Sequence, residues 1–156
     1  LEMSAGWVYR LPTESEWEYA CRGGPQTDKL QSVFHYYLAK PTDLLLPEQA
    51  NFGHVKGLRR TCKVGSYAPN PLGLFDMHGN VEEWCFDWYG PYEAGEQSDP
   101  VGRADGHARV TRGGSYNLHR VGGFPGNARY CRSANRSATR SCRSFSNLKS
   151  RRWRGS

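Results

Sequence analysis

Turn-forming residues interrupt this sequence so often that no segment has the pattern of a long helix, and this limits the fold more than any other feature. Of the 156 residues, 18 are glycine and 9 are proline. The densest run of turn formers is VGSYAPNPLGLFDMHGNV, residues 64–81, which contains the strong breakers Asn70-Pro71 and Gly79-Asn80. A chain of this length fits one domain with a sizeable core. We therefore predict an α+β domain with short helices, a small antiparallel sheet and extensive ordered loops.

One short helix is clearly marked, in LPTESEWEYACRGG at residues 11–24. Thr13 is followed three residues later by Glu16, which is the capping-box pattern of a helix start. The two glycines at the end of the segment supply the stop. We therefore expect the helix to begin just after Thr13 and to end before Gly23.

The apolar residues of this helix fall on one face. They are Trp17, Ala20 and Cys21, spaced i, i+3, i+4. Cys21 is therefore predicted to point into the core, and Glu14 and Glu18 are expected to turn away from it.

Short strands are predicted elsewhere. EWCFDWYG, which begins at Glu83, alternates with period two and places Trp84, Phe86 and Trp88 on one side, which indicates a half-buried strand. VFHYYLA, ARVTRGG and ARYCRSA have the composition of further short strands, and residues 41–47 that of a loop.

Charge is divided unevenly along the chain. Residues 1–105 carry nine Lys/Arg and fifteen Asp/Glu, a net charge of −6, whereas residues 106–156 carry twelve Lys/Arg and no acid. Such a split suits a polyanion-binding face, or a basic half that folds against an acidic one. No nucleic-acid-binding motif accompanies the basic half, so we do not expect a nucleic-acid partner. No apolar run approaches the roughly 20 residues of a membrane span.

The five cysteines are an odd number and include no C-x-x-C pair, so a structural zinc site is not expected. One long-range disulfide and several buried thiols both remain open. No signal peptide is visible, and composition leaves open whether the protein is cytoplasmic or exported.

Three blocks of the sequence carry a family resemblance. YRLPTESEWEYACRGG, NPLGLFDMHGNVEEWCFDWYG and RVTRGGSYN, followed by RYCRSANRS, occur in this order. They resemble the formylglycine-generating enzyme (sulfatase-modifying factor) family over about residues 7–138, which implies a fold related to C-type lectins. The usual N-terminal segment is missing and SNLKSRRWRGS departs from the family's closing strand, so we expect a partial domain at 1–148 and a basic flexible tail at 149–156.

The resemblance implies an active site that has lost its metal ligands. Family enzymes oxidise a sulfatase cysteine to formylglycine with O2 and a copper ion held by two cysteines, because soft Cu(I) prefers thiolates. The first of these positions is Leu118 and the second falls at or near Gly123. Ser115, His119 and Arg120 match the family and are expected to line the site. Copper is therefore not an expected cofactor.

Other polar residues of the motifs have simpler interpretations. No His-Asp pair accompanies Ser115, so we expect it to form a hydrogen bond in the site or in its turn. His78 and His119 are expected to be hydrogen-bonded or solvent-facing, and Arg112 to be structural or at the surface.

The resemblance further implies calcium at the turn DMHGNVEEW. The family ligands there are a side-chain oxygen, two backbone carbonyls and a carboxylate, at Asp76, Gly79, Val81 and Glu83. These are hard donors that suit Ca2+, although an ordinary tight turn fits the same residues. A second family site would use Asn51 and the carbonyl of Phe52, but the segment with its other ligands is shortened here.

The resemblance also implies a disulfide between Cys21 and Cys131. Closing so long a loop would stabilise the fold by about 3–5 kcal/mol. The bridge would form in an exported protein and stay reduced otherwise. Cys85 is predicted to be a small buried residue.

Two classes of function compete. In the first, the domain is non-catalytic or repurposed and binds a protein or peptide, for example a sulfatase, or a glycan. Loop aromatics would suit such binding: Tyr89, Tyr92, Tyr116 and Trp153. In the alternative, it is an oxidoreductase that converts a sulfatase cysteine to formylglycine, or an enzyme of altered chemistry. We favour the first because the copper-binding cysteine pair is absent.

Overall fold

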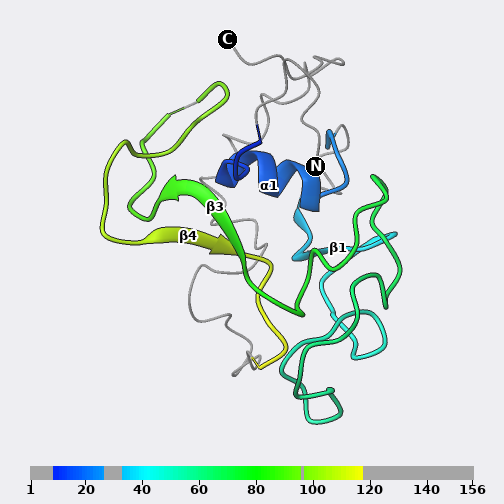
Figure 1. The fold of residues 1–156 in the computed structure, drawn as a ribbon. Coiled ribbons are helices and arrows are strands. Elements are labelled where there is room, and N and C mark those ends of the chain that lie inside the picture. Colours follow the sequence, from blue (N-terminus) through cyan, green and yellow to red (C-terminus); the bar gives the residue numbers. More distant parts are fainter. Residues whose placement is uncertain (1–8, 27–32, 96, 118–156) are drawn as a thin grey trace.

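The computed structural model describes residues 9–26, 33–95 and 97–117. Within them the chain forms one helix and four strands joined by long ordered loops (Figure 1). In chain order these are α1 (Glu14–Cys21), β1 (Tyr36–Tyr37), β2 (Pro41–Thr42), β3 (Glu83–Trp88) and β4 (Arg109–Arg112). The mixed α+β class with small antiparallel sheets is confirmed.

Helix α1 begins and ends where the sequence predicts. The Thr13 side chain accepts a hydrogen bond from the Glu16 backbone N–H at 3.2 Å, and the Glu16 carboxylate accepts one from the Thr13 N–H at 2.8 Å. Both halves of the capping box are thus present. Gly23 follows the helix with a φ of +81°, a conformation that glycine adopts without strain.

Four strands form two separate antiparallel ribbons. In the first, Tyr36 of β1 lies opposite Thr42 of β2. Pro41 therefore belongs to a strand, and the prediction of a loop from residue 41 is wrong at its first two residues. A proline is tolerated there because an edge strand has positions where no N–H is needed.

The second ribbon, β3–β4, is the larger one. Its register places Glu83 opposite Arg112 and Trp88 opposite Arg109, with an irregularity between Trp84 and Trp88. The predicted half-buried strand is confirmed, and its buried side carries Cys85 and Asp87. The aromatic side faces outward instead, with Trp84 59% exposed.

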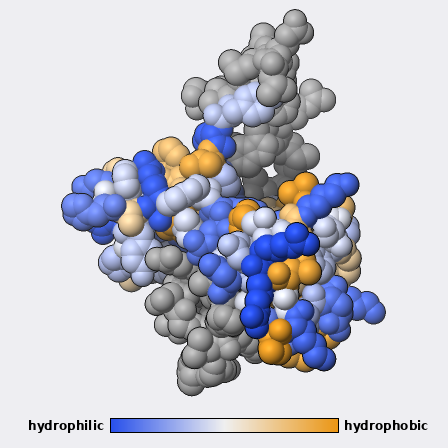
Figure 2. Space-filling view, turned by 60° about the horizontal axis from the view of Figure 1, so that its bottom comes forward, coloured by the Kyte–Doolittle hydropathy of each residue, from blue (hydrophilic) through white to orange (hydrophobic). Residues whose placement is uncertain are grey.

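The main core lies between α1 and the β3–β4 ribbon, and a residue of β1 also packs into it. Its buried members are Trp17, Cys21, Tyr37, Met77, Cys85 and Val110. A second, smaller cluster lies beside the β1–β2 hairpin and contains Leu45, Ala50 and Phe52. Apolar residues also reach the surface, and on the face shown in Figure 2 they lie in small patches among polar ones. Cys21 points into the core as predicted.

Two acidic residues of α1 contradict the prediction that they turn away from the protein. Glu18 is buried and accepts a hydrogen bond from Arg22 Nε at 2.6 Å, and Arg22 also donates to the Tyr37 hydroxyl at 2.5 Å. Glu14 accepts hydrogen bonds from the buried Arg112 and, at 2.6 Å, from the Tyr92 hydroxyl. A helix of only eight residues is packed on several sides, and its carboxylates can be buried because each is paired.

In the described part of the chain, no helix combines the length and the apolar character that a membrane crossing requires.

Candidate functional site

The DMHGN turn, residues 76–80, leads into β3 and brings together most of the family motifs. Three of its residues adopt left-handed backbone conformations: Asp76 (φ +57°), Gly79 (φ +87°) and Asn80 (φ +62°). Asp, Asn and Gly are the residue types that tolerate this region best. The local sequence therefore specifies the tight turn.

Gly79 is required by a close approach as well as by its backbone angle. A Cβ atom at this position would lie 2.2 Å from the Asn51 carbonyl oxygen. The same oxygen accepts the Asn80 N–H at 2.7 Å. The turn is thus pressed against the segment around Asn51, where only a glycine fits.

Two carboxylates flank the turn, and each has one oxygen engaged. Asp76 Oδ2 accepts the Gly65 N–H at 2.8 Å, and Glu83 Oε2 accepts the Trp17 indole N–H at 2.6 Å. The other oxygen of each carboxylate has no hydrogen-bond partner among the described residues. Burial raises the pKa of Glu83, the Trp17 hydrogen bond lowers it, and the charge of Asp76 raises it again.

This donor set fits a hard divalent cation. The carboxylate oxygens of Asp76 and Glu83 and the backbone carbonyls of Gly79 and Val81 are hard oxygen donors of the kind that such a cation prefers. Among residues 9–26, 33–95 and 97–117, no three His, Cys, Asp or Glu side chains gather as a metal cluster. A cation at this turn would therefore need carbonyl ligands as well as the two carboxylates.

The two residues predicted for a second calcium site lie against the turn. Asn51 is 1% exposed and donates from Nδ2 to the Arg60 carbonyl at 2.8 Å, while its Oδ1 has no hydrogen-bond partner in the described part of the chain. Phe52 is buried in the second core cluster. Among the described residues, this position thus offers one buried amide oxygen without a hydrogen-bond partner.

His78 lies on the inner side of the turn. Its Nε2 accepts the Tyr37 N–H at 2.9 Å and lies 3.8 Å from Cys21 Sγ, and its ring makes an edge contact with Tyr36. The prediction that His78 is hydrogen-bonded is confirmed. Its imidazole links the turn to β1.

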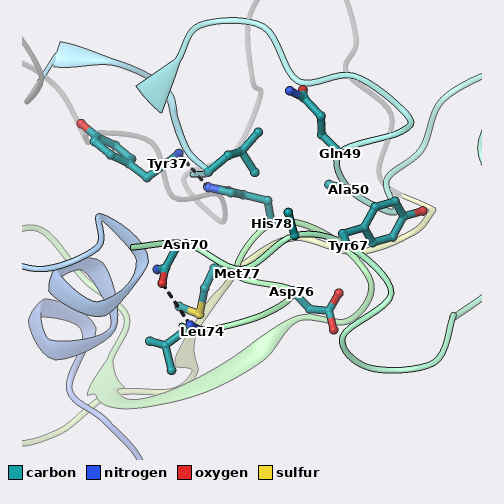
Figure 3. Close-up of a pocket in the computed structure, with 11 residues that line it drawn as sticks. Tyr37, Gln49, Ala50, Tyr67, Asn70, Leu74, Asp76, Met77 and His78 are labelled. Carbon is teal, nitrogen blue, oxygen red and sulfur yellow. Dashed lines mark hydrogen bonds between the residues drawn. The ribbon is translucent and has the colours of Figure 1, made fainter. Parts of the chain in front are cut away.

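A small pocket opens beside the turn and is shown in Figure 3. Tyr67, Gln49 and Ala50 line one part of it, and Met77 and His78 another. Asp76 lies on the side of Tyr67 and points away from His78 (Figure 3). Burial raises the pKa of Tyr67, and the nearby Cys62 and Asp76 raise it further.

The RGGSYN block, residues 112–117, lies across the same turn. Gly113 accepts the Gly79 N–H at 2.7 Å, and the Tyr116 N–H donates to the Asn80 carbonyl at 3.1 Å. Ser115 donates from its hydroxyl to Asn117 Oδ1 at 2.7 Å, which confirms the predicted hydrogen bond within the turn. Arg112 is buried and structural, as expected, and its partner Glu14 is 98 residues away in sequence.

No local pattern in the sequence indicated the contacts that Arg112 makes. Glu14 and Tyr92 meet its guanidinium from two distant segments. Asp87 joins the same region by accepting the Glu14 N–H at 2.6 Å, and burial raises its pKa. The side of β3 that carries Asp87 could be found from the strand period, but its partner on the helix could not.

Comparison with known proteins decides the family. The sulfatase-modifying factor enzyme 1-like domain matches residues 2–148. The chain belongs to this family. It is 42% identical over 124 residues to a formylglycine-generating enzyme of Streptomyces coelicolor, which covers 70% of the chain and 37% of that enzyme. It is 40% identical over 118 residues to the formylglycine-generating enzyme of Mus musculus, covering 71% of the chain and 31% of the enzyme.

The sulfatase-modifying factor domain also occurs in proteins with other names. The chain is 44% identical over 117 residues to the serine/threonine-protein kinase pkn1 of Chlamydia pneumoniae, covering 72% of the chain and 17% of that protein. Among solved structures it resembles the Treponema denticola variable protein 1, with a TM-score of 0.50 and 36% identity over 69% of this chain and 36% of that one. The chain thus spans about a third of the length of its formylglycine-generating relatives.

Several predicted residues of the sulfatase-modifying factor site fall beyond the described part of the chain. They are Leu118, His119, Arg120, Gly123 and Cys131. The structure describes the block that leads into them and the turn that supports this block. Cys85 is fully buried, as predicted, and burial raises the pKa of its thiol to about 12.

Proposed function

We propose that this sulfatase-modifying factor domain binds a protein or peptide and does not carry out copper-dependent oxidation. The observation that carries the proposal is Leu118, which stands in RGGSYNLHR where the family resemblance places the first copper-binding cysteine. A leucine side chain has no atom that can ligate Cu(I), which prefers thiolates. The second position, at or near Gly123, has no ligand either.

The cysteines of the described region give no replacement. Cys21 and Cys85 are fully buried in the core, and the high pKa of Cys85 keeps it in the thiol form. Cys62 lies against Asn80, with its backbone N–H 3.0 Å from Asn80 Oδ1. These positions support the proposal that the domain keeps the family scaffold without its copper chemistry.

A second candidate function is the oxidation of a sulfatase cysteine to formylglycine. The identity of 42% to the Streptomyces coelicolor formylglycine-generating enzyme favours it. In this case Ser115, His119 and Arg120 would line the reactive site. Fold and family alone do not choose between the two functions, because the same domain occurs in proteins with different names.

The expected partner is a protein or peptide, such as a sulfatase. A glycan is the other expected class of ligand, because the scaffold resembles that of C-type lectins. Tyr89 is 64% exposed and could contact a partner. Tyr92 has a structural role in addition, since its hydroxyl binds Glu14.

Incubation of the chain with copper, O2 and a Cys-x-Pro-x-Arg peptide tests the choice. We expect mass spectrometry to find the peptide unchanged. A product with the mass of the formylglycine peptide would contradict the proposal and favour the second function. A catalytically active family enzyme, run in parallel, serves as the positive control.

The proposal includes Ca2+ as a structural cofactor, held by Asp76, Glu83 and the carbonyls of Gly79 and Val81. The second oxygen of each carboxylate, which has no hydrogen-bond partner among the described residues, supports it, as does the contribution of the Asp76 charge to the raised pKa of Glu83. The cation would neutralise both charges and fix the turn. It also includes a Cys21–Cys131 disulfide in an oxidising compartment, supported by the buried position of Cys21.

A melting-temperature titration with CaCl2 tests the cofactor. Binding to the folded state alone stabilises by about 2.7 kcal/mol at a hundredfold excess over Kd, which raises the melting temperature by several degrees. The Asp76→Asn variant should lose most of this shift, whereas Asp43→Asn, at an exposed carboxylate of the β1–β2 hairpin, should keep it. An equal shift in both variants would place the cation elsewhere.

A further inference from the structure

Two backbone hydrogen bonds connect the DMHGN turn to the RGGSYN block. The Gly79 N–H donates to the Gly113 carbonyl at 2.7 Å, and the Tyr116 N–H donates to the Asn80 carbonyl at 3.1 Å. One bond runs in each direction, so residues 113–116 are held at both ends. The position of this loop is therefore set by the backbone orientation of residues 79 and 80.

Packing reinforces the connection. Gly113 has a φ of +87°, and a Cβ there would lie 3.5 Å from the Trp17 ring, 3.6 Å from the Val81 carbonyl oxygen and 3.8 Å from that of Met77. Gly113 thus packs against the Trp17 ring and the carbonyl groups of Met77 and Val81. Trp17 in turn donates to Glu83 at 2.6 Å.

The opposite side of the turn is fixed to other segments. The Asn80 N–H donates to the Asn51 carbonyl at 2.7 Å, and Asn80 Oδ1 accepts the Cys62 N–H at 3.0 Å. The turn therefore rests on residues 51 and 62 on one side and supports the loop on the other.

We propose that the turn positions the 113–117 loop, and that a cation bound at the turn controls the geometry of this loop. The Asn80 carbonyl, which holds Tyr116, lies in the chain between the Gly79 and Val81 carbonyls, which are the backbone ligands of the proposed Ca2+. A cation that fixes the two flanking carbonyls restricts the peptide unit between them. The inference rests on the calcium part of the proposed function.

The consequence reaches the site that follows the loop. Residues 118–120, which the family resemblance assigns to the reactive or binding site, come directly after Asn117. Cation binding and loop order are then linked reciprocally, so each changes the other by the same factor, commonly 5- to 150-fold. Asn80 and Gly79 act as positioning residues in this arrangement.

Hydrogen exchange of the full chain, with and without 5 mM CaCl2, tests the linkage. We expect Ca2+ to slow exchange of the amides at residues 114–117 by about tenfold, within the usual range of such couplings. The Tyr89 amide, which donates to the Ala108 carbonyl at the far end of the β3–β4 ribbon, should not change and is the internal control.

A matched pair of variants separates the hydrogen bond from the side chain. Tyr116→Pro removes the N–H that Asn80 accepts, whereas Tyr116→Ala keeps it. By reciprocity, calorimetry with CaCl2 should show an affinity about tenfold weaker in Tyr116→Pro and close to wild type in Tyr116→Ala.

The outcomes distinguish the two proposals. If calorimetry detects calcium binding but hydrogen exchange in the loop is not slowed, the linkage is wrong and the calcium site is still supported. Absence of any calcium binding would overturn both. If Tyr116→Pro fails to fold, the wild-type comparison of loop exchange with and without CaCl2 decides the matter by itself.

Discussion

The Glu83–Arg112 end of the β3–β4 ribbon is built from buried charges and backbone hydrogen bonds, whereas the Trp88–Arg109 end is built from half-buried or exposed rings and cations. At the first end, Arg112 is 3% exposed and pairs with Glu14. The DMHGN turn and the 113–117 loop meet there.

At the second end, Arg109 lies over two aromatic rings. Its guanidinium carbon is 3.6 Å from the centre of the Trp88 ring and 5.4 Å from that of Phe86. Nearby, Arg103 and Asp105 form an exposed ion pair at 3.6 Å. Contacts of this kind stabilise a surface modestly and can rearrange.

The difference shows which end of the ribbon should be more sensitive to substitution. A buried charge costs several kcal/mol when its partner is removed, while an exposed one is solvated by water. The end of the ribbon that supports the family motifs is therefore the one that tolerates least change. The following variants test this contrast, in order of decreasing effect.

Removal of the buried cation should have the largest effect. Arg112→Met leaves the Glu14 carboxylate buried without its partner and should lower the free energy of unfolding by about 3–5 kcal/mol. Arg109→Met, at the other end of β4, should cost about 1 kcal/mol. Urea unfolding measures both, and equal losses would remove the contrast.

The second-largest loss of stability is expected when a methyl group is added at Gly79. Gly79→Ala combines a left-handed φ of +87° with a contact of 2.2 Å to the Asn51 carbonyl, so a loss of about 3 kcal/mol is expected. Gly73→Ala has a similar φ of +77° and nothing within 4 Å, and should lose about 1 kcal/mol. The difference between the two losses in unfolding free energy, measured by urea unfolding, gives the cost of the close contact apart from that of the backbone strain.

Asp87 should give a smaller effect that depends on pH. Burial raises its pKa in the folded state, so its contribution is greatest below its unfolded pKa, near 3.8, and is lost as the pH rises through the folded pKa. Asp87→Asn cannot titrate, so the variant should lose less stability relative to wild type at pH 7 than at pH 4. Unfolding curves at the two pH values check this, and the reverse order would contradict the direction of the shift.

The smallest effect is expected at the outer face of β3. Trp84 is 59% exposed, so Trp84→Ser should change the free energy of unfolding by about 0.5 kcal/mol or less. A loss comparable to that of Arg112→Met would show that the outer face is also part of the core.

Local patterns allowed the helix and the larger ribbon to be predicted. The capping box placed α1 because its two hydrogen bonds join residues only three apart. The period of β3 was clear, but the period alone does not say which side is buried, and the polar side proved to be the inner one. Pairing between β1 and Pro41–Thr42 depends on a partner strand, so the composition of residues 41–47 did not reveal it.

The candidate site was predictable where a motif is local and unpredictable where distant segments meet. The residues of the DMHGN turn, its glycine and its carboxylates follow from the sequence. The burial of Glu14 does not, because Arg112 and Tyr92 lie 98 and 78 residues away. The hydrogen bonds of Gly79 and Asn80 with the RGGSYN block could not be predicted either, because they join backbone atoms and do not depend on the side-chain pattern.

The most direct test of the central claim, a family scaffold without copper chemistry, is Cu(I) binding under anaerobic conditions in competition with a chromophoric chelator. We expect the wild-type chain to leave the copper–chelator complex unchanged, because Leu118 and Gly123 cannot ligate copper. The double variant Leu118→Cys with Gly123→Cys should take up copper by restoring two thiolates. Withdrawal of one equivalent of Cu(I) by the wild-type chain would contradict the claim.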